Sequence, residues 1–196
     1  MLNVQGKTVR EIALEMPLTT RVFEEFKIDY CCHGDTPFDD ACRNVGASPE
    51  IVKEKIDGVL GGSTNSDQES FSKMDLSDLV DHILDKHHVY TRDEMSHLTP
   101  LMAKVASRHG EHYQYLLELK ELFQALCDDL EPHMMKEEMV LFPYIQRLDY
   151  SYSNHLTAAY PPFGTVQHPV NMMNVEHEEV GELLSKMREI TSDYEL

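Results

Sequence analysis

Three histidines lie at helical spacing within apolar stretches of the second half of the chain: His88, His133 and His177. Glu137 follows His133 by one helical turn, so both side chains point to the same side of a helix. A carboxylate among apolar side chains is unfavourable unless a cation or hydrogen bonds compensate its charge. Imidazole and carboxylate groups together bind iron and similar transition metals. The pattern predicts a metal site shared by three helices.

A single buried histidine is more often a hydrogen-bonded core residue than a ligand, but three in phase with one acid favour a metal site. The positions of His88 and His133 along the axis of a helical bundle can be compared if the chain turns near Gly110. His88 then precedes the turn by nearly as many residues as His133 follows it. At ~1.5 Å per residue, the two histidines reach the same level of a helical bundle. His109 would lie at the turn, roughly 30 Å from that level.

The elements that must position these ligands are long amphipathic helices. One begins near Asp75, the next follows Gly110, and the third begins near Pro169. No stretch shows the alternation of a strand, so the predicted class is all-α. Pro100 and Pro132 are expected to bend the first two helices. The predicted core positions are Leu76, Val80, Leu84, His88, Met95, Leu98, Met102 and Val105, then Leu119, Leu122, Leu126, Leu130, His133, Glu137, Val140 and Tyr144, then Met173, His177, Val180, Leu184 and Met187.

The first sixty residues predict a separate, small helical domain. Thr8 to Glu11 has the form of a capping box, and Pro17 ends the helix that it begins. A second helix starts at Thr19 or Thr20, a third runs from Pro37 to near Gly46, and a fourth runs from Ser48 to about Leu60. A polar segment rich in glycine and serine follows. We therefore predict a domain at 1–60, a linker at 61–73 and a second domain at 74–196.

The charge of the chain limits its partners. It carries 35 acidic and 17 basic residues, a formal net charge of −18 at pH 7. Such a surface repels phosphate backbones and anionic lipids, so we expect neither nucleic acid nor membranes as partners. No apolar run approaches the ~18 residues of a membrane span, and the N-terminus lacks the pattern of a secretory signal. We expect a cytoplasmic protein.

Four cysteines are present, and two of them, Cys31 and Cys32, are adjacent. This arrangement rarely suits a structural disulfide framework, so reduced thiols are expected. The pair could handle iron or nitric oxide or guard the metal site; alternatively, the two are small residues in a tight turn. Reactivity depends on a lowered thiol pKa, which the sequence does not reveal. Cys42 and Cys127 lie on predicted helices and are interpreted as packing residues.

Together these motifs resemble the iron–sulfur cluster repair di-iron proteins, the repair-of-iron-centres family, which is hemerythrin-like. The matching segments are Asp29–Gly34 with its paired cysteines, Asp81–His88, His133–Glu138 and Glu176–Leu184. The resemblance implies a four-helix up-and-down bundle with an oxo-bridged di-iron centre. The metal ligands that it implies are His88, His133, Glu137 as a bridging carboxylate, His177 and, as a further family histidine, His109.

The resemblance also implies a function in the stress response. Members repair iron–sulfur clusters damaged by nitric oxide or oxidative stress, by donating iron or handling nitric oxide. Damaged iron–sulfur proteins would be partners, nitric oxide or oxygen a small ligand, and Cys31 and Cys32 the reactive thiols. The alternatives are a non-catalytic oxygen- or iron-sensing hemerythrin-like module and a plain interaction protein. The sequence does not decide whether the protein is an enzyme.

One departure from the family pattern concerns the fourth long helix, which carries a further histidine and a glutamate one turn later. No second His-x-x-x-Glu occurs in this sequence. The bundle is therefore expected to be one helix short, with an exposed apolar groove. Three alternatives follow: the whole protein continues past Leu196, a second copy completes the bundle as a homodimer, or an incomplete site binds iron weakly or as one ion.

Overall fold

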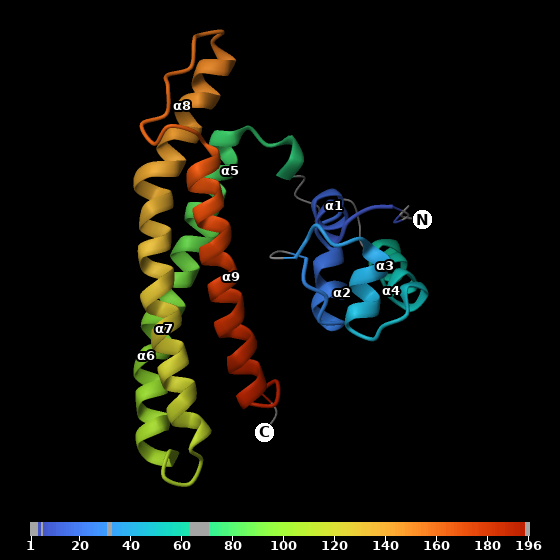
Figure 1. Ribbon diagram of the computed structural model, residues 1–196, viewed down its shortest axis with the longest axis vertical. Helices are drawn as coiled ribbons and strands as arrows, with labels where there is room; N and C mark the ends of the chain where they lie inside the picture. The colour runs from blue at the N-terminus through green and yellow to red at the C-terminus, as the bar shows by residue number, and fades with distance from the viewer. Residues whose placement is uncertain (1–3, 5, 31–32, 63–70, 195–196) are drawn as a thin grey trace. The chain divides into compact units, whose positions relative to one another are not determined.

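The computed structural model describes residue 4 and residues 6–30, 33–62 and 71–194 (Figure 1). In these ranges the regular elements are helices, with one isolated bridge between Thr8 and Pro37. The predicted all-α class is confirmed. The chain divides into two compact units, Met1–Met74 and Asp75–Leu196.

Besides the short 3₁₀-helix η1 (Phe71–Lys73), the described part of the N-terminal unit contains four α-helices whose ends follow local sequence signals. They are α1 (Val9–Glu15), α2 (Thr19–Glu25), α3 (Phe38–Asn44) and α4 (Pro49–Gly62). Thr8 and Glu11 form the predicted capping box at the start of α1. The helices enclose one apolar core, whose most completely buried members include Ile12, Phe23, Phe38, Val52 and Ile56.

The turn after α2 requires glycine at position 34. A Cβ atom there would lie 2.4 Å from the Tyr30 carbonyl oxygen and 2.9 Å from the Cβ of Arg10. The Gly34 carbonyl accepts a hydrogen bond from the Arg10 backbone N–H. Cys31 and Cys32, the predicted reactive thiols, lie outside the described residues. Their neighbours Asp29 and His33 form an ion pair with Oδ2 and Nδ1 2.7 Å apart.

The C-terminal unit is built from three long helical rods. The first joins α5 (Leu76–His82), the π-helix η2 (Ile83–His88) and α6 (Val89–His109). The second joins α7 (Tyr115–Lys136), the π-helix η3 (Glu137–Leu141) and α8 (Phe142–Ser153), and the third is α9 (Gln167–Ile190). Figure 1 shows α6 and α7 lying side by side, and α7 also contacts α9. The central rod can therefore face ligands on both neighbours.

The chain turns at Gly110, as predicted. A Cβ atom at this position would lie 2.5 Å from the Ala106 carbonyl oxygen and 2.6 Å from a methyl group of Leu117. Pro100 and Pro132 lie inside α6 and α7 and end neither helix. Every helix in the described ranges is too short or too polar to span a membrane.

Two small apolar clusters stabilise the C-terminal unit. Val80, Leu141, Phe142 and Met173 form the first. The second contains Leu119, Phe123, Leu126 and Met187. Along the second rod, His133 and Glu137 fall between Leu126 of one cluster and Leu141 of the other. The predicted metal ligands thus interrupt the apolar core.

Four apolar side chains that were predicted in the core are exposed: Leu76, Val105, Val140 and Leu184. Val140 was expected in the core but is 44% exposed, while Leu141 is only 8% exposed. Likewise Val105 is exposed and Ala106 is buried. Val140 and Leu141 lie inside η3, where a π-helical turn closes i→i+5 hydrogen bonds and holds more residues than an α-helical turn, so the buried position there moves from Val140 to Leu141. One π-helix ends at His88 and the other begins at Glu137.

Candidate metal centre

Four of the predicted ligands converge between the rods. His88 ends η2, His133 is on the last turn of α7, Glu137 begins η3 and His177 is on α9. His88 and His133 are buried, with 5% and 4% of the whole residue exposed, and Glu137 is half-buried. His177 is exposed, although its Nε2 atom lies 3.0 Å from Nε2 of His133.

His133, Glu137 and His177 form the tightest group. One ligand atom from each lies within 4.8 Å of the others. An imidazole nitrogen binds a first-row metal at about 2.1 Å, so two nitrogens bound at right angles are about 3.0 Å apart. The separation of the His133 and His177 Nε2 atoms, 3.0 Å, agrees with this value. Two imidazoles and one carboxylate are also a recurrent ligand set for non-haem iron.

His88 joins the group through Glu137. The Oε2 atom of Glu137 lies 3.1 Å from Nε2 of His88, and its Oε1 atom lies 3.6 Å from Nε2 of His133. The two carboxylate oxygens therefore face different histidines. This arrangement suits a carboxylate that bridges two cations.

In His88 and His133, the hydrogen bond made by Nδ1 determines which ring nitrogen faces the proposed metal centre. Nδ1 of His88 lies 2.8 Å from Oε1 of Glu138, and Nδ1 of His133 lies 2.8 Å from Oε2 of Glu176. Because a carboxylate only accepts, each Nδ1 carries the proton and donates it. In the neutral rings, Nε2 then presents its lone pair toward Glu137. A proton or a metal cation must lie among these electron-rich atoms, so the donor set fits a cation.

The pKa values of His133 and His177 are shifted in opposite directions. The Glu137 carboxylate raises the pKa of His133 above its ordinary value, and Glu176 acts in the same direction. Desolvation lowers the pKa of His177 although part of its side chain is exposed, and repulsion from His133 adds to the effect. Without metal, a proton on His133 can bridge the two rings. A cation must displace that proton when it binds.

The structure does not bring His109 to this group. His109 ends α6 and is exposed. It is separated from His88 by the continuous helix α6, which spans roughly 30 Å at 1.5 Å per residue. Its exposed position at the turn agrees with the depth argument, and we leave His109 out of the proposed ligand set.

Sequence reasoning missed two acids that contact the ligands, Glu138 and Glu176. Both lie beside a predicted ligand in the sequence, Glu138 after Glu137 and Glu176 before His177. On a regular helix, sequence neighbours point in different directions, so adjacency predicted no shared site. Only the packing of the rods shows that each acid reaches a histidine on another rod.

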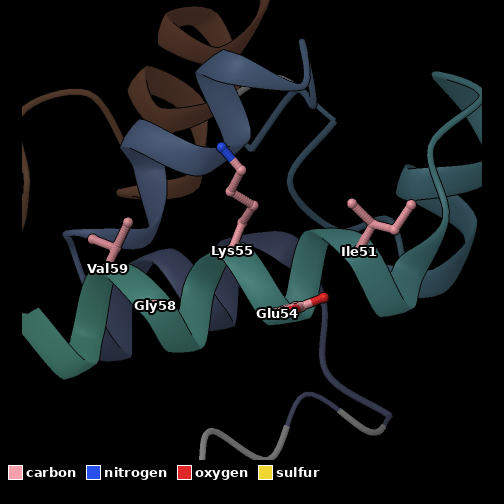
Figure 2. Close-up of a pocket in the computed structure, with 5 residues that line it drawn as sticks. All are labelled: Ile51, Glu54, Lys55, Gly58 and Val59. Carbon is pink, nitrogen blue, oxygen red and sulfur yellow. The ribbon is translucent and has the colours of Figure 1, made fainter.

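A surface hollow of about 480 Å³ lies elsewhere, on α4 of the N-terminal unit (Figure 2). Ile51, Glu54, Lys55, Gly58 and Val59 line it, and the Lys55 ammonium pairs with Glu25 at 2.7 Å. No histidine or cysteine is among its lining residues. We assign it no part in metal binding.

Comparison with known proteins matches both parts of the chain to known families. Residues 79–195, more than half of the chain, match the hemerythrin HHE cation binding domain. Residues 5–59 match ScdA_N, described as a domain of unknown function (DUF542).

Several curated proteins are similar over most of the chain. An iron-sulfur cluster repair protein ScdA from Staphylococcus haemolyticus is 28% identical, covering 95% of this chain and 79% of the relative. A probable iron-sulfur cluster repair protein from Haemophilus influenzae is 22% identical, covering 98% and 80%. An iron-sulfur cluster repair protein YtfE from Salmonella schwarzengrund is 26% identical, covering 93% and 76%. Through its C-terminal unit, the chain belongs to the hemerythrin HHE cation-binding family.

Proposed function

We propose that this protein repairs damaged iron–sulfur clusters in the cytoplasm and that its C-terminal unit holds an oxo-bridged di-iron centre. The proposed ligands are His88, His133, Glu137 and His177. The observation that carries the proposal is their convergence: each ligand comes from a different turn or rod, yet their donor atoms face one another. The names of the relatives support the choice of iron–sulfur clusters as the target.

The residues of the centre have separable tasks. Bound iron would supply redox and Lewis-acid chemistry. His88 and His133 offer buried Nε2 atoms, and Glu137 offers one oxygen to each side. The exposed side of His177 gives small ligands such as nitric oxide or oxygen, and departing iron, a route to the centre. Displacement of the His133 proton makes iron binding weaken as the pH falls.

We further propose that Cys31 and Cys32 handle iron or nitric oxide during repair. The Asp29–His33 ion pair brackets the two cysteines in the sequence. An imidazole beside a thiol can take up its proton and so favour the reactive thiolate. A Cys31→Ser/Cys32→Ser variant should keep its iron but repair clusters more slowly.

The central experiment measures iron content and repair together. Protein purified without oxygen should contain about two iron ions per completed four-helix bundle and should restore an enzyme whose [4Fe–4S] cluster was damaged by nitric oxide. The His133→Ala variant should lose both properties. His97→Ala, an exposed histidine on α6, serves as the matched control and should retain both. Equal iron content in the two variants would contradict the proposed ligand set.

A second function is favoured by one observation: all four proposed ligands belong to the Asp75–Leu196 unit. A hemerythrin-like module could therefore sense oxygen or iron without using the cysteine pair. Full repair by the Cys31→Ser/Cys32→Ser variant would exclude a role for the thiols in repair. Iron binding combined with no repair by the unaltered protein would favour the sensor.

A further inference from the structure

Two hydrogen-bonded chains of the same kind lead away from the proposed metal centre. Each begins at a ligand histidine, passes through a glutamate and ends at a basic side chain. The first chain is His88, Glu138 and Arg92, and the second is His133, Glu176 and Lys136.

The first chain joins the first two rods. Nδ1 of His88 lies 2.8 Å from Oε1 of Glu138. The Arg92 guanidinium donates to both oxygens of Glu138, from Nη1 at 2.7 Å and from Nη2 at 3.3 Å. Its Nε also donates to Glu131 on α7, at 3.1 Å to each oxygen. A two-pronged pair of this kind fixes both the position and the tilt of the carboxylate.

The second chain joins the other pair of rods. Nδ1 of His133 on α7 lies 2.8 Å from Oε2 of Glu176 on α9. The Lys136 ammonium donates to the other oxygen of the same carboxylate. In both chains the basic residue lies one turn after its histidine on the same rod, and the glutamate comes from the neighbouring rod. The repeated arrangement argues against a chance surface contact.

Burial separates these chains from ordinary surface ion pairs. The His88 and His133 side chains are 7% and 5% exposed, and the Glu138 and Glu176 side chains are 28% and 17% exposed. A carboxylate held against the Nδ1–H of a ligand histidine fixes the ring rotation and the tautomer, and makes Nε2 a stronger donor to metal.

We propose that Glu138 and Glu176 are positioning residues of the metal centre: each holds one ligand histidine so that its Nε2 atom faces the metal. Arg92 and Lys136 hold these carboxylates in place. The inference rests on the proposed metal site. Glu138 acts through His88, and Glu176 acts through His133 and therefore on the His133–His177 side. The two glutamates therefore orient ligands on different sides of the proposed metal centre.

The test uses four variants of the full chain and the unaltered protein. Glu138→Leu and Glu176→Leu remove the acceptor, whereas Glu138→Gln and Glu176→Gln keep an acceptor oxygen without the charge. Iron affinity is measured by competition with a chelator of known affinity. We expect about 10- to 100-fold weaker binding in the Leu variants and intermediate losses in the Gln variants. Glu178→Gln, exposed beside His177, is the control and should bind as the unaltered chain does.

A spectroscopic measurement separates positioning from a merely structural role. In Mössbauer spectra of the iron-loaded Gln variants, Glu138→Gln and Glu176→Gln should each alter a different one of two iron signals. Unchanged affinity and spectra in both Gln variants would overturn the inference. So would identical changes in both iron signals from either variant. If the unaltered chain binds no iron, the proposed function itself fails, which distinguishes the two results.

Discussion

The two units of the molecule are stabilised in different ways. The most completely buried side chains of the described residues, among them Phe23, Phe38 and Ile56, lie in the N-terminal unit. The C-terminal unit has two small apolar clusters with a polar group between them. Large apolar side chains stay exposed on its rods, including Val89, Leu101, Met139, Val175 and Leu184.

This difference follows from where each unit places its polar groups. Apolar burial stabilises a fold in proportion to the area removed from water, and the N-terminal unit has one continuous core for this purpose. In the C-terminal unit, histidines and a glutamate occupy the positions between the two apolar clusters. A bound cation would compensate these groups, so we expect metal to contribute to the stability of this unit alone.

The largest expected effect is the loss of a core ring from the N-terminal unit. Phe23 is fully buried, and its ring lies against those of Phe38 and Tyr30. Phe23→Ala should lower the free energy of unfolding of this unit by about 3–5 kcal/mol, because it leaves a cavity. Urea unfolding followed by circular dichroism measures the loss. Iron content should be unaffected, and a parallel fall in iron would show that the units are not independent.

Removal of metal should affect the other unit. A cation present at 1,000 times its dissociation constant stabilises the state that binds it by about 4 kcal/mol. Chelation should therefore lower the melting temperature of the C-terminal unit and leave the transition of the N-terminal unit in place. Calorimetry can follow both transitions, with Phe23→Ala identifying the N-terminal one. His133→Ala should make the protein insensitive to the chelator.

Removal of a helix cap should have a smaller effect. Thr8 caps α1 by accepting a hydrogen bond from the Glu11 backbone, while the Glu11 carboxylate accepts one from the Thr8 backbone. Thr8→Ala should lower the free energy of unfolding by about 1 kcal/mol. Thr8→Ser keeps the hydroxyl and should recover most of the loss. Equal urea midpoints for the Ala and Ser variants would contradict the importance of the cap.

A further effect is confined to alkaline pH. Burial, together with the nearby charge of Asp39, raises the pKa of Cys42 from 9.0 to about 11. The folded N-terminal unit thus holds the thiol proton more tightly than the unfolded chain does. The resulting stabilisation is complete below about pH 9 and is lost as the pH rises toward about 11. Urea midpoints between pH 8 and pH 10.5 should fall less steeply for Cys42→Ala than for the unaltered chain.

The sequence determined most of the helix boundaries in the N-terminal unit, because these depend on local chemistry. The capping box at Thr8, the break at Pro17 and the start at Ser48–Pro49 each involve residues within one turn of each other. The phase of His133 and Glu137 was also predictable, since residues four apart on a helix share a face. The predictions for Cys31 and Cys32 remain predictions.

Only the tertiary structure decided which residues of the C-terminal rods are buried and which side chains contact a neighbouring rod. The π-helices that bury Leu141 in place of Val140 have no local signal as strong as a proline or a cap. The contacts of Glu138 with His88 and of Glu176 with His133 join residues far apart in the sequence, and depend on which rods lie together. Such contacts form because packing brings separate helices to one depth, and helical periodicity alone does not specify that arrangement.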